Sequence, residues 1–153
     1  MLKADAYNHG ATAVAKACST QADRYGVATP KEGSALRKAG VKLPIDVFSP
    51  APTDIADIVS AGLTPVVHSF ETVAGMRFCR GAEAEVKLDT GMHRMGFKTP
   101  SEAEMAARML SDYGIRVRAL VTHFASKETS AGQVARFKFL KEVFEHAYGA
   151  ECK

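Results

Sequence analysis

The chain has 153 residues, a length that supports one domain with a hydrophobic core rather than two large domains. Its 46% hydrophobic and 24% charged residues are ordinary for a soluble globular protein, and its net charge of +3 comes without a basic block. Nothing therefore argues for nucleic acid or an anionic membrane as a partner, and there is no apolar run for a bilayer span or signal peptide. Three widely spaced cysteines, Cys18, Cys79 and Cys152, fit reduced thiols in a cytoplasmic protein better than a disulfide framework or a zinc site.

In chain order, short apolar strands alternate with helices. A first strand is predicted to end at Lys3, before the polar turn Tyr7–Gly10. The other strands are predicted at residues 25–28, 45–48, 65–67, 84–88 and 117–121. Helices are predicted from about 11 to 22, from the cap at 29 to 40, from after 53 to 62, from the cap at 69 to 81, from the cap at 99 to 114, and from 130 onward.

Two helix starts share the sequence Thr-Pro-x-Glu, at 29–32 and 99–102. The threonine caps the helix, the proline fits its first position, and the glutamate returns a bond to the cap. In the last helix, one apolar stripe predicts core packing, with a partner-binding role the weaker alternative. The stripe consists of Val134, Phe137, Leu140, Phe144 and Ala147.

Strands that alternate with helices in this way predict parallel β/α units, either as an open doubly wound sheet or as a barrel. The open sheet is disfavoured because no G-x-G-x-x-G is present and Gly91 to Gly96 lacks the Lys-Ser/Thr of a P-loop. Polar residues fall instead at the carboxyl ends of several strands, which meet at one mouth of a barrel. These residues are Lys3, Tyr7, His68, Lys87, Arg94 and His123. The predicted fold class is α/β, an incomplete (β/α)8 TIM-type barrel with about six parallel β/α units.

Both chain ends are abrupt. Met1 lies against the middle of a predicted strand, and Lys153 comes just after a helix. Six strands do not close an eight-stranded ring, so we expect residues 1–153 to be a fragment of one barrel domain.

Three segments carry a family resemblance: Lys3–Gly10, Val86–Phe97 and Thr122–Ala125. Together they resemble the alanine racemases, pyridoxal-phosphate enzymes built from an α/β barrel followed by a β domain. The family pattern around the lysine is Lys-Ala-Asp/Asn-Ala-Tyr-Gly-His-Gly, and Asn8 replaces its first glycine. Because asparagine tolerates left-handed backbone, we expect the turn to survive this replacement.

The resemblance implies that Lys3 forms a Schiff base with pyridoxal 5'-phosphate and acts as one of two acid/base groups that interconvert L- and D-alanine. It also implies a cytoplasmic homodimer that supplies D-alanine for peptidoglycan. The opposing base in the family is a tyrosine from the partner subunit's β domain, and no tyrosine of this chain matches its motif. With the β domain absent, we expect the polypeptide by itself to be inactive.

Four further residues take roles from the resemblance. Arg94 matches an arginine that contacts the cofactor's phenolic oxygen and the substrate carboxylate, and Lys87 matches a strand lysine that is carbamylated in many members. Tyr7 matches a tyrosine near the cofactor phosphate, and His123 a histidine beside the cofactor ring. Each has a structural alternative: a surface ion pair for Arg94, an unmodified paired lysine for Lys87, a packing aromatic for Tyr7 and a strand-end histidine for His123.

Other functions stay open. A broader amino-acid racemase that accepts serine is close to the leading interpretation. A third interpretation is a non-catalytic barrel that either binds pyridoxal phosphate or is purely structural. A related barrel decarboxylase is disfavoured by the Asp-Thr-Gly-Met-x-Arg-x-Gly run that starts at Asp89. No metal site is assigned, because His9, His68 and His93 lack partners at ligand spacing.

Overall fold

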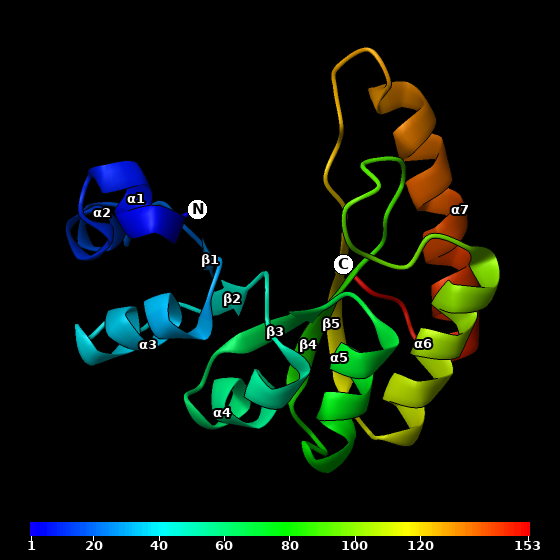
Figure 1. The fold of residues 1–153 in the computed structure, drawn as a ribbon, viewed down its shortest axis with the longest axis horizontal. Coiled ribbons are helices and arrows are strands. Elements are labelled where there is room, and N and C mark those ends of the chain that lie inside the picture. Colours follow the sequence, from blue (N-terminus) through cyan, green and yellow to red (C-terminus); the bar gives the residue numbers. More distant parts are fainter. The chain divides into compact units, whose positions relative to one another are not determined.

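The structure is a computed structural model that describes residues 1–153, and it divides into two compact units, Met1–Val66 and Val67–Lys153. Figure 1 shows the helices and strands of both units. None of the helices combines the length and apolar character that a bilayer-spanning segment needs.

The first unit repeats a strand followed by a helix. Strand β1 pairs in parallel with β2, with Tyr25 opposite Ile45, and β2 pairs in parallel with β3, with Asp46 opposite Thr64. Its elements are α1 (Lys3–Asn8), α2 (Ala11–Ala17), β1 (Tyr25–Val27), α3 (Pro30–Lys38), β2 (Ile45–Val47), the 3-10 turn η1 (Pro52–Asp54), α4 (Ile55–Ser60) and β3 (Thr64–Val67), which carries the chain into the second unit.

The core of this unit lies between its strands and helices. All residues of β1, β2 and β3 are buried, which is expected for parallel strands. The clustered apolar side chains are Leu2, Ala6, Ala15, Tyr25, Val27, Leu36, Ile45, Val47, Ile58 and Leu63. Because Leu2 and Ala6 belong to this cluster, the segment that carries Lys3 is anchored in the core on both sides of the lysine.

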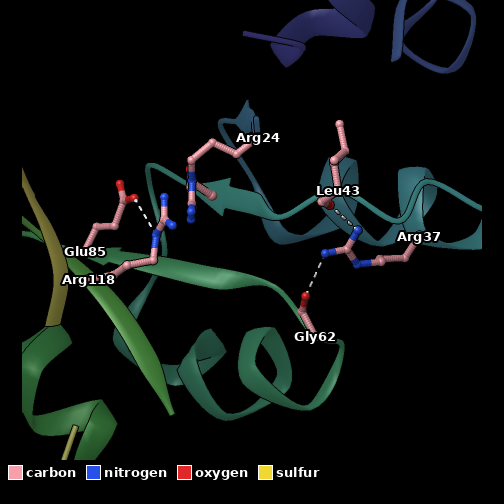
Figure 2. A network of polar contacts seen from close by, with 7 residues as sticks. Arg24, Arg37, Leu43, Gly62, Glu85 and Arg118 are labelled. Carbon is pink, nitrogen blue, oxygen red and sulfur yellow. Dashed lines mark hydrogen bonds and ion pairs between the residues drawn. The ribbon is translucent and has the colours of Figure 1, made fainter. Parts of the chain in front are cut away.

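Arg37 ties the end of α3 to the neighbouring loops. Its guanidinium donates to the carbonyl oxygens of Val41 (2.9 Å), Leu43 (2.8 Å) and Gly62 (2.9 Å), and Figure 2 shows the side chain between Leu43 and Gly62. One rigid fork thereby satisfies three loop carbonyls that no regular element would pair.

The second unit is also built from parallel β/α repeats. Its elements are α5 (Phe70–Gly75), the 3-10 turn η2 (Met76–Phe78), β4 (Glu83–Lys87), α6 (Pro100–Asp112), β5 (Arg116–Val121) and α7 (Ser130–Tyr148). β4 and β5 pair in parallel from Glu83 opposite Arg116 to Lys87 opposite Val121, with a bulge after Ala84. Helices α6 and α7 pack on each other, as Figure 1 shows.

Charged side chains also lie along the β4–β5 pair. The carboxylate of Glu85 on β4 is buried and lies 3.8 Å from Arg118 Nε on β5, a contact drawn in Figure 2. After α7 the backbone returns to β5, where Lys153 accepts from Leu120 N–H (2.9 Å) and donates to Arg118 (3.2 Å). The backbone of Lys153 is thus hydrogen-bonded to β5 in both directions.

Most predicted elements are confirmed, including both Thr-Pro-x-Glu capping boxes. The predicted strand at Met1–Lys3 is wrong: Leu2 N–H donates to Gly26 O (2.7 Å), but the backbone turns immediately afterwards. Five strands are formed instead of six.

Two helices also differ from expectation. The helix predicted to reach residue 22 ends at Ala17, where the Ser19 hydroxyl donates to the Lys16 carbonyl (2.8 Å) and competes with a further turn. In α7 the predicted stripe buries Leu140 and Phe144, but Val134 is exposed and the polar neighbour Gln133 is buried instead.

Candidate active site

The segment after Lys3 is a left-handed turn. Within α1, Ala4, Asp5, Ala6 and Tyr7 have φ between 51° and 56°, and Asn8 follows with φ 67°. For residues with a side chain this conformation costs roughly 1–2 kcal/mol each, so the surrounding structure must hold it. The expectation that asparagine fits the turn at position 8 is confirmed.

Backbone and side-chain hydrogen bonds hold this turn. Ala6 N–H donates to Leu2 O and Gly10 N–H to Asp5 O, both at 3.0 Å. The carboxylate of Asp5 accepts from Ala11 N–H (2.7 Å), which fixes the entry into α2. These hydrogen bonds close the turn and attach it to the start of α2.

Lys3 and Tyr7 lie together on the exposed side of the turn. The Lys3 ammonium lies 5.9 Å from the centroid of the Tyr7 ring, within the range of a cation–π contact. Both side chains are exposed, so a ligand can reach the amine and the phenol. The structure thus brings two of the predicted site residues together.

In the second unit, Asp89 organises the loop that carries Arg94. Its buried carboxylate accepts from the backbone N–H groups of Gly91 (3.0 Å), His93 (3.0 Å) and Arg94 (3.1 Å). Burial alone would raise the pKa of Asp89, but these three donors and the nearby His93 outweigh it and hold the pKa below its usual value.

The same loop closes on the end of β4. Phe97 N–H donates to Lys87 O (3.0 Å), and Asp89 N–H donates to Phe97 O (2.9 Å). Gly96 has φ 122°, and a Cβ there would lie 2.8 Å from Asp89 N, so only glycine fits this close approach. The loop is rigid in its backbone, while the Arg94 side chain is exposed.

Lys87 lies at the end of β4 and is buried. Burial lowers the pKa of its amine, the positive charge of Arg94 lowers it further, and the carboxylate of Asp89 acts in the opposite direction. The lowered pKa increases the neutral fraction of the amine at neutral pH. Lys87, Asp89 and Arg94 therefore form one electrostatic group.

His123 follows β5 on the adjacent loop, and its side chain is exposed. Thr122 and Thr90 share a hydrogen bond between their hydroxyls (2.8 Å), which ties this loop to the one that carries Arg94. The predicted residues of the second unit thus lie on two loops that are bonded to each other.

Gln133 of α7 supports both loops and was not singled out from the sequence. Its Oε1 accepts from Ala125 N–H (3.0 Å) and from the Thr129 hydroxyl (3.1 Å). Its Nε2 has no hydrogen-bond partner, and it would lie 3.0 Å from a Cβ at Gly91. The only signal in the sequence is a polar residue directly before Val134 of the apolar stripe, which by itself does not predict burial.

The predicted site residues are chemically suited to pyridoxal phosphate. An exposed amine at Lys3 suits an aldehyde, and the guanidinium of Arg94, the phenol of Tyr7 and the imidazole of His123 suit anionic and hydrogen-bonding groups. Lys3 and Tyr7 belong to the first unit, and Lys87, Arg94 and His123 to the second.

Parallel β/α units with polar side chains on the loops after the strands define the class: an α/β protein that forms part of a (β/α)8 barrel, as predicted. A sequence model of the family described as "Alanine racemase, N-terminal domain" matches residues 1–153. The chain belongs to this family, which confirms the resemblance found in its motifs.

Individual relatives of the chain are alanine racemases as well. An alanine racemase of Streptococcus pneumoniae (strain Taiwan19F-14) is 34% identical over 164 residues, covering 95% of this chain and 43% of that protein. Among solved structures, the alanine racemase of Clostridium difficile 630 matches with a TM-score of 0.88 and 31% identity, covering 99% of this chain and 45% of that chain. The Bacillus anthracis alanine racemase with bound L-Ala-P matches with a TM-score of 0.85 and 27% identity, covering 98% and 42%. The chain thus spans less than half the length of the relatives it matches.

Proposed function

We propose that this chain is the cofactor-carrying part of an alanine racemase, an isomerase that interconverts L- and D-alanine. The observation that carries the proposal is the family match over the whole chain, combined with an exposed lysine on a rigid turn at the position of the family motif. The substrate is inferred from relatives that are named alanine racemase, one of which has L-Ala-P bound.

Pyridoxal phosphate, when bound, supplies an aldehyde that condenses with an amine and a ring that withdraws electrons from the α-carbon of an amino acid. Lys3 would hold the cofactor covalently through its Nζ. Once the amino group of the substrate has displaced it, the freed Nζ would move a proton to and from the α-carbon. Tyr7 would donate its phenolic O–H to the cofactor phosphate, His123 would contact the cofactor ring, and Arg94 would bind the substrate carboxylate with its fixed fork.

Lys87 orients Arg94 in this proposal. Its lowered pKa increases the fraction of neutral amine, which is the form that reacts with carbon dioxide to give a carbamate and a proton. A carbamate would replace a positive charge beside Arg94 by a negative one and hold the guanidinium. With labelled bicarbonate, we expect a carbon-13 carbamate resonance that is lost in Lys87→Arg, and persistence of the resonance in the variant would reject this role.

The assembly proposed for the working enzyme is a cytoplasmic homodimer. A second acid/base group must face Lys3 across the substrate for inversion, and by family resemblance it comes from a β domain of the partner subunit. Residues 1–153 contain no match to that motif, so we assign them to the barrel domain only.

Borohydride reduction tests the cofactor role directly. The chain is incubated with pyridoxal phosphate, reduced and digested, and the pyridoxyl adducts are mapped by mass spectrometry. We expect an adduct on Lys3 at cofactor concentrations that leave the exposed Lys16 unmodified, and no corresponding adduct in Lys3→Arg. Absence of the Lys3 adduct at saturating cofactor would remove the proposed function and favour a purely structural barrel.

A further inference from the structure

The two Thr-Pro-x-Glu capping boxes of this chain differ in one respect. In α6, Glu102 Oε2 accepts from Lys98 N–H (2.6 Å) and Thr99 N–H (3.2 Å), and these are its only backbone bonds. In α3, Glu32 Oε2 accepts the equivalent pair, from Ala28 N–H (2.8 Å) and Thr29 N–H (3.0 Å). Its other oxygen, Oε1, reaches back 28 residues along the chain and accepts from Ala4 N–H (2.9 Å).

The additional bond lies next to the proposed nucleophile. Ala4 is the first left-handed residue of the turn, and its N–H belongs to the peptide group that it shares with Lys3. Fixing this peptide plane fixes the direction in which the Lys3 side chain leaves the backbone. On the other side of Lys3, only Leu2 N–H is tied to β1. Glu32 therefore supplies the side-chain hydrogen bond that fixes the first peptide group of the turn.

Glu32 is charged when it does this. Burial acts to raise the pKa of its carboxyl, but the donors from Ala4, Thr29 and Ala28 together outweigh burial and lower the pKa below its usual value. Hydrogen bonds to a carboxylate are about twice as strong as those between neutral groups. The two oxygens of the Glu32 carboxylate thus connect the start of α3 to the turn after Lys3.

We propose that Glu32 is a positioning residue for Lys3: it holds the Lys3–Ala4 peptide so that the amine is presented to the cofactor's aldehyde. The inference deepens the proposed function and rests on it for the identity of the aldehyde. The restraint on the backbone itself stands on the hydrogen bonds alone.

Glu32→Gln separates the two tasks of this side chain. Glutamine retains one acceptor oxygen, and directing it at Ala28 and Thr29 preserves two bonds, whereas directing it at Ala4 preserves one. We therefore expect the cap to survive and the Ala4 bond to be lost. Glu102→Gln is the matched control in the other Thr-Pro-x-Glu box. Thr29→Ala is a second control, because it weakens the start of α3 without touching Ala4.

Two readouts are compared across these variants. The first is the rate of pyridoxyl adduct formation on Lys3, and the second is the exchange rate of the Ala4 amide by NMR. In Glu32→Gln we expect adduct formation about tenfold slower and amide exchange about tenfold faster, the effect of one charge-assisted hydrogen bond. Glu102→Gln and Thr29→Ala should match the unaltered chain in both.

The outcomes are distinct. Equal Ala4 exchange and equal Lys3 labelling in Glu32→Gln and Glu102→Gln would overturn the positioning role while leaving the proposed function intact. Absence of the Lys3 adduct in the unaltered chain would reject the proposed function, and the exchange data would still decide whether Glu32 holds the turn. If Glu32→Gln does not fold, Glu32→Asp, which keeps the charge but is too short to reach Ala4, takes its place with the same expected results.

Discussion

At the scale of single residues, each of the two loops that carry the proposed cationic groups is contacted by one acidic side chain that accepts three backbone N–H groups. Asp89 accepts all three from the loop of Arg94, whereas Glu32 accepts one from Ala4 in the turn after Lys3 and two from Ala28 and Thr29 at the start of α3. Both carboxyls have a lowered pKa. Backbone donors are thereby satisfied without regular secondary structure, and the exposed cations project from fixed loops.

Asp89→Asn should destabilise the second unit at neutral pH by about 2–4 kcal/mol, because an amide accepts fewer backbone bonds than a carboxylate in the same place. Since the folded pKa of Asp89 is lowered, its contribution is complete above the unfolded pKa of about 4 and is lost as the pH falls through the folded pKa. Urea unfolding at several pH values should therefore show the two proteins converging in acid.

The exposed Asp112 at the end of α6 provides the control. Asp112→Asn should change the free energy of unfolding by less than about 0.5 kcal/mol at any of these pH values. A gap between Asp89→Asn and the unaltered chain that stays constant down to strong acid would contradict the assigned role of the carboxylate.

Gln133→Leu should loosen the loop that carries His123. Leucine fills a similar volume but leaves Ala125 N–H without its acceptor, at a cost of about 1–3 kcal/mol. Gln133→Glu keeps an acceptor and should retain the Ala125 bond. Amide exchange at Ala125 is the measurement: we expect protection in the glutamate variant and its loss in the leucine variant. Equal protection in both would show that Gln133 does not hold the loop.

At the scale of elements, the sequence was most informative where a local rule has a single chemical cause. Thr29 and Thr99 were predicted as caps and accept from Glu32 N–H and Glu102 N–H as expected. The turn after Lys3 was not foreseen as left-handed, because its alanines favour right-handed helices and only Asn8 hints at positive φ. Contacts with distant residues decide its hand, and no local pattern encodes them.

This reversal of hand predicts opposite effects for one substitution at two exposed alanines. Ala4→Gly removes the Cβ penalty of the left-handed region and should stabilise the first unit by up to about 1 kcal/mol. Ala35→Gly, inside the right-handed helix α3, should destabilise it by roughly 0.5–1 kcal/mol. Thermal unfolding followed by circular dichroism measures both. Destabilisation of equal size at the two positions would contradict the left-handed assignment.

At the scale of the whole molecule, the barrel class followed from polar residues at successive strand ends. Lys87 is the last residue of β4, and Arg94 and His123 lie on the loops after β4 and β5. The number of strands was not predicted correctly. The segment before Lys3 makes a single hydrogen bond to β1, from Leu2 N–H to Gly26 O, and one such bond does not form a strand. Gln133 was missed for a related reason: burial of a polar side chain depends on which loops fold over it.

The last prediction concerns turnover by the 153-residue polypeptide. Inversion at the α-carbon needs a proton donor and an acceptor on opposite faces, and Lys3 can serve only one face. None of the four tyrosines, Tyr7, Tyr25, Tyr113 and Tyr148, matches the family motif for the second group, and the hydroxyl of Tyr25 is already committed to Ala15 O (2.5 Å). We therefore expect no detectable racemisation of either alanine enantiomer at saturating pyridoxal phosphate, measured by chiral chromatography. An intact family member in the same assay sets the detection limit, and turnover approaching its rate, if abolished by Lys3→Ala, would mean that this chain contains its own second base.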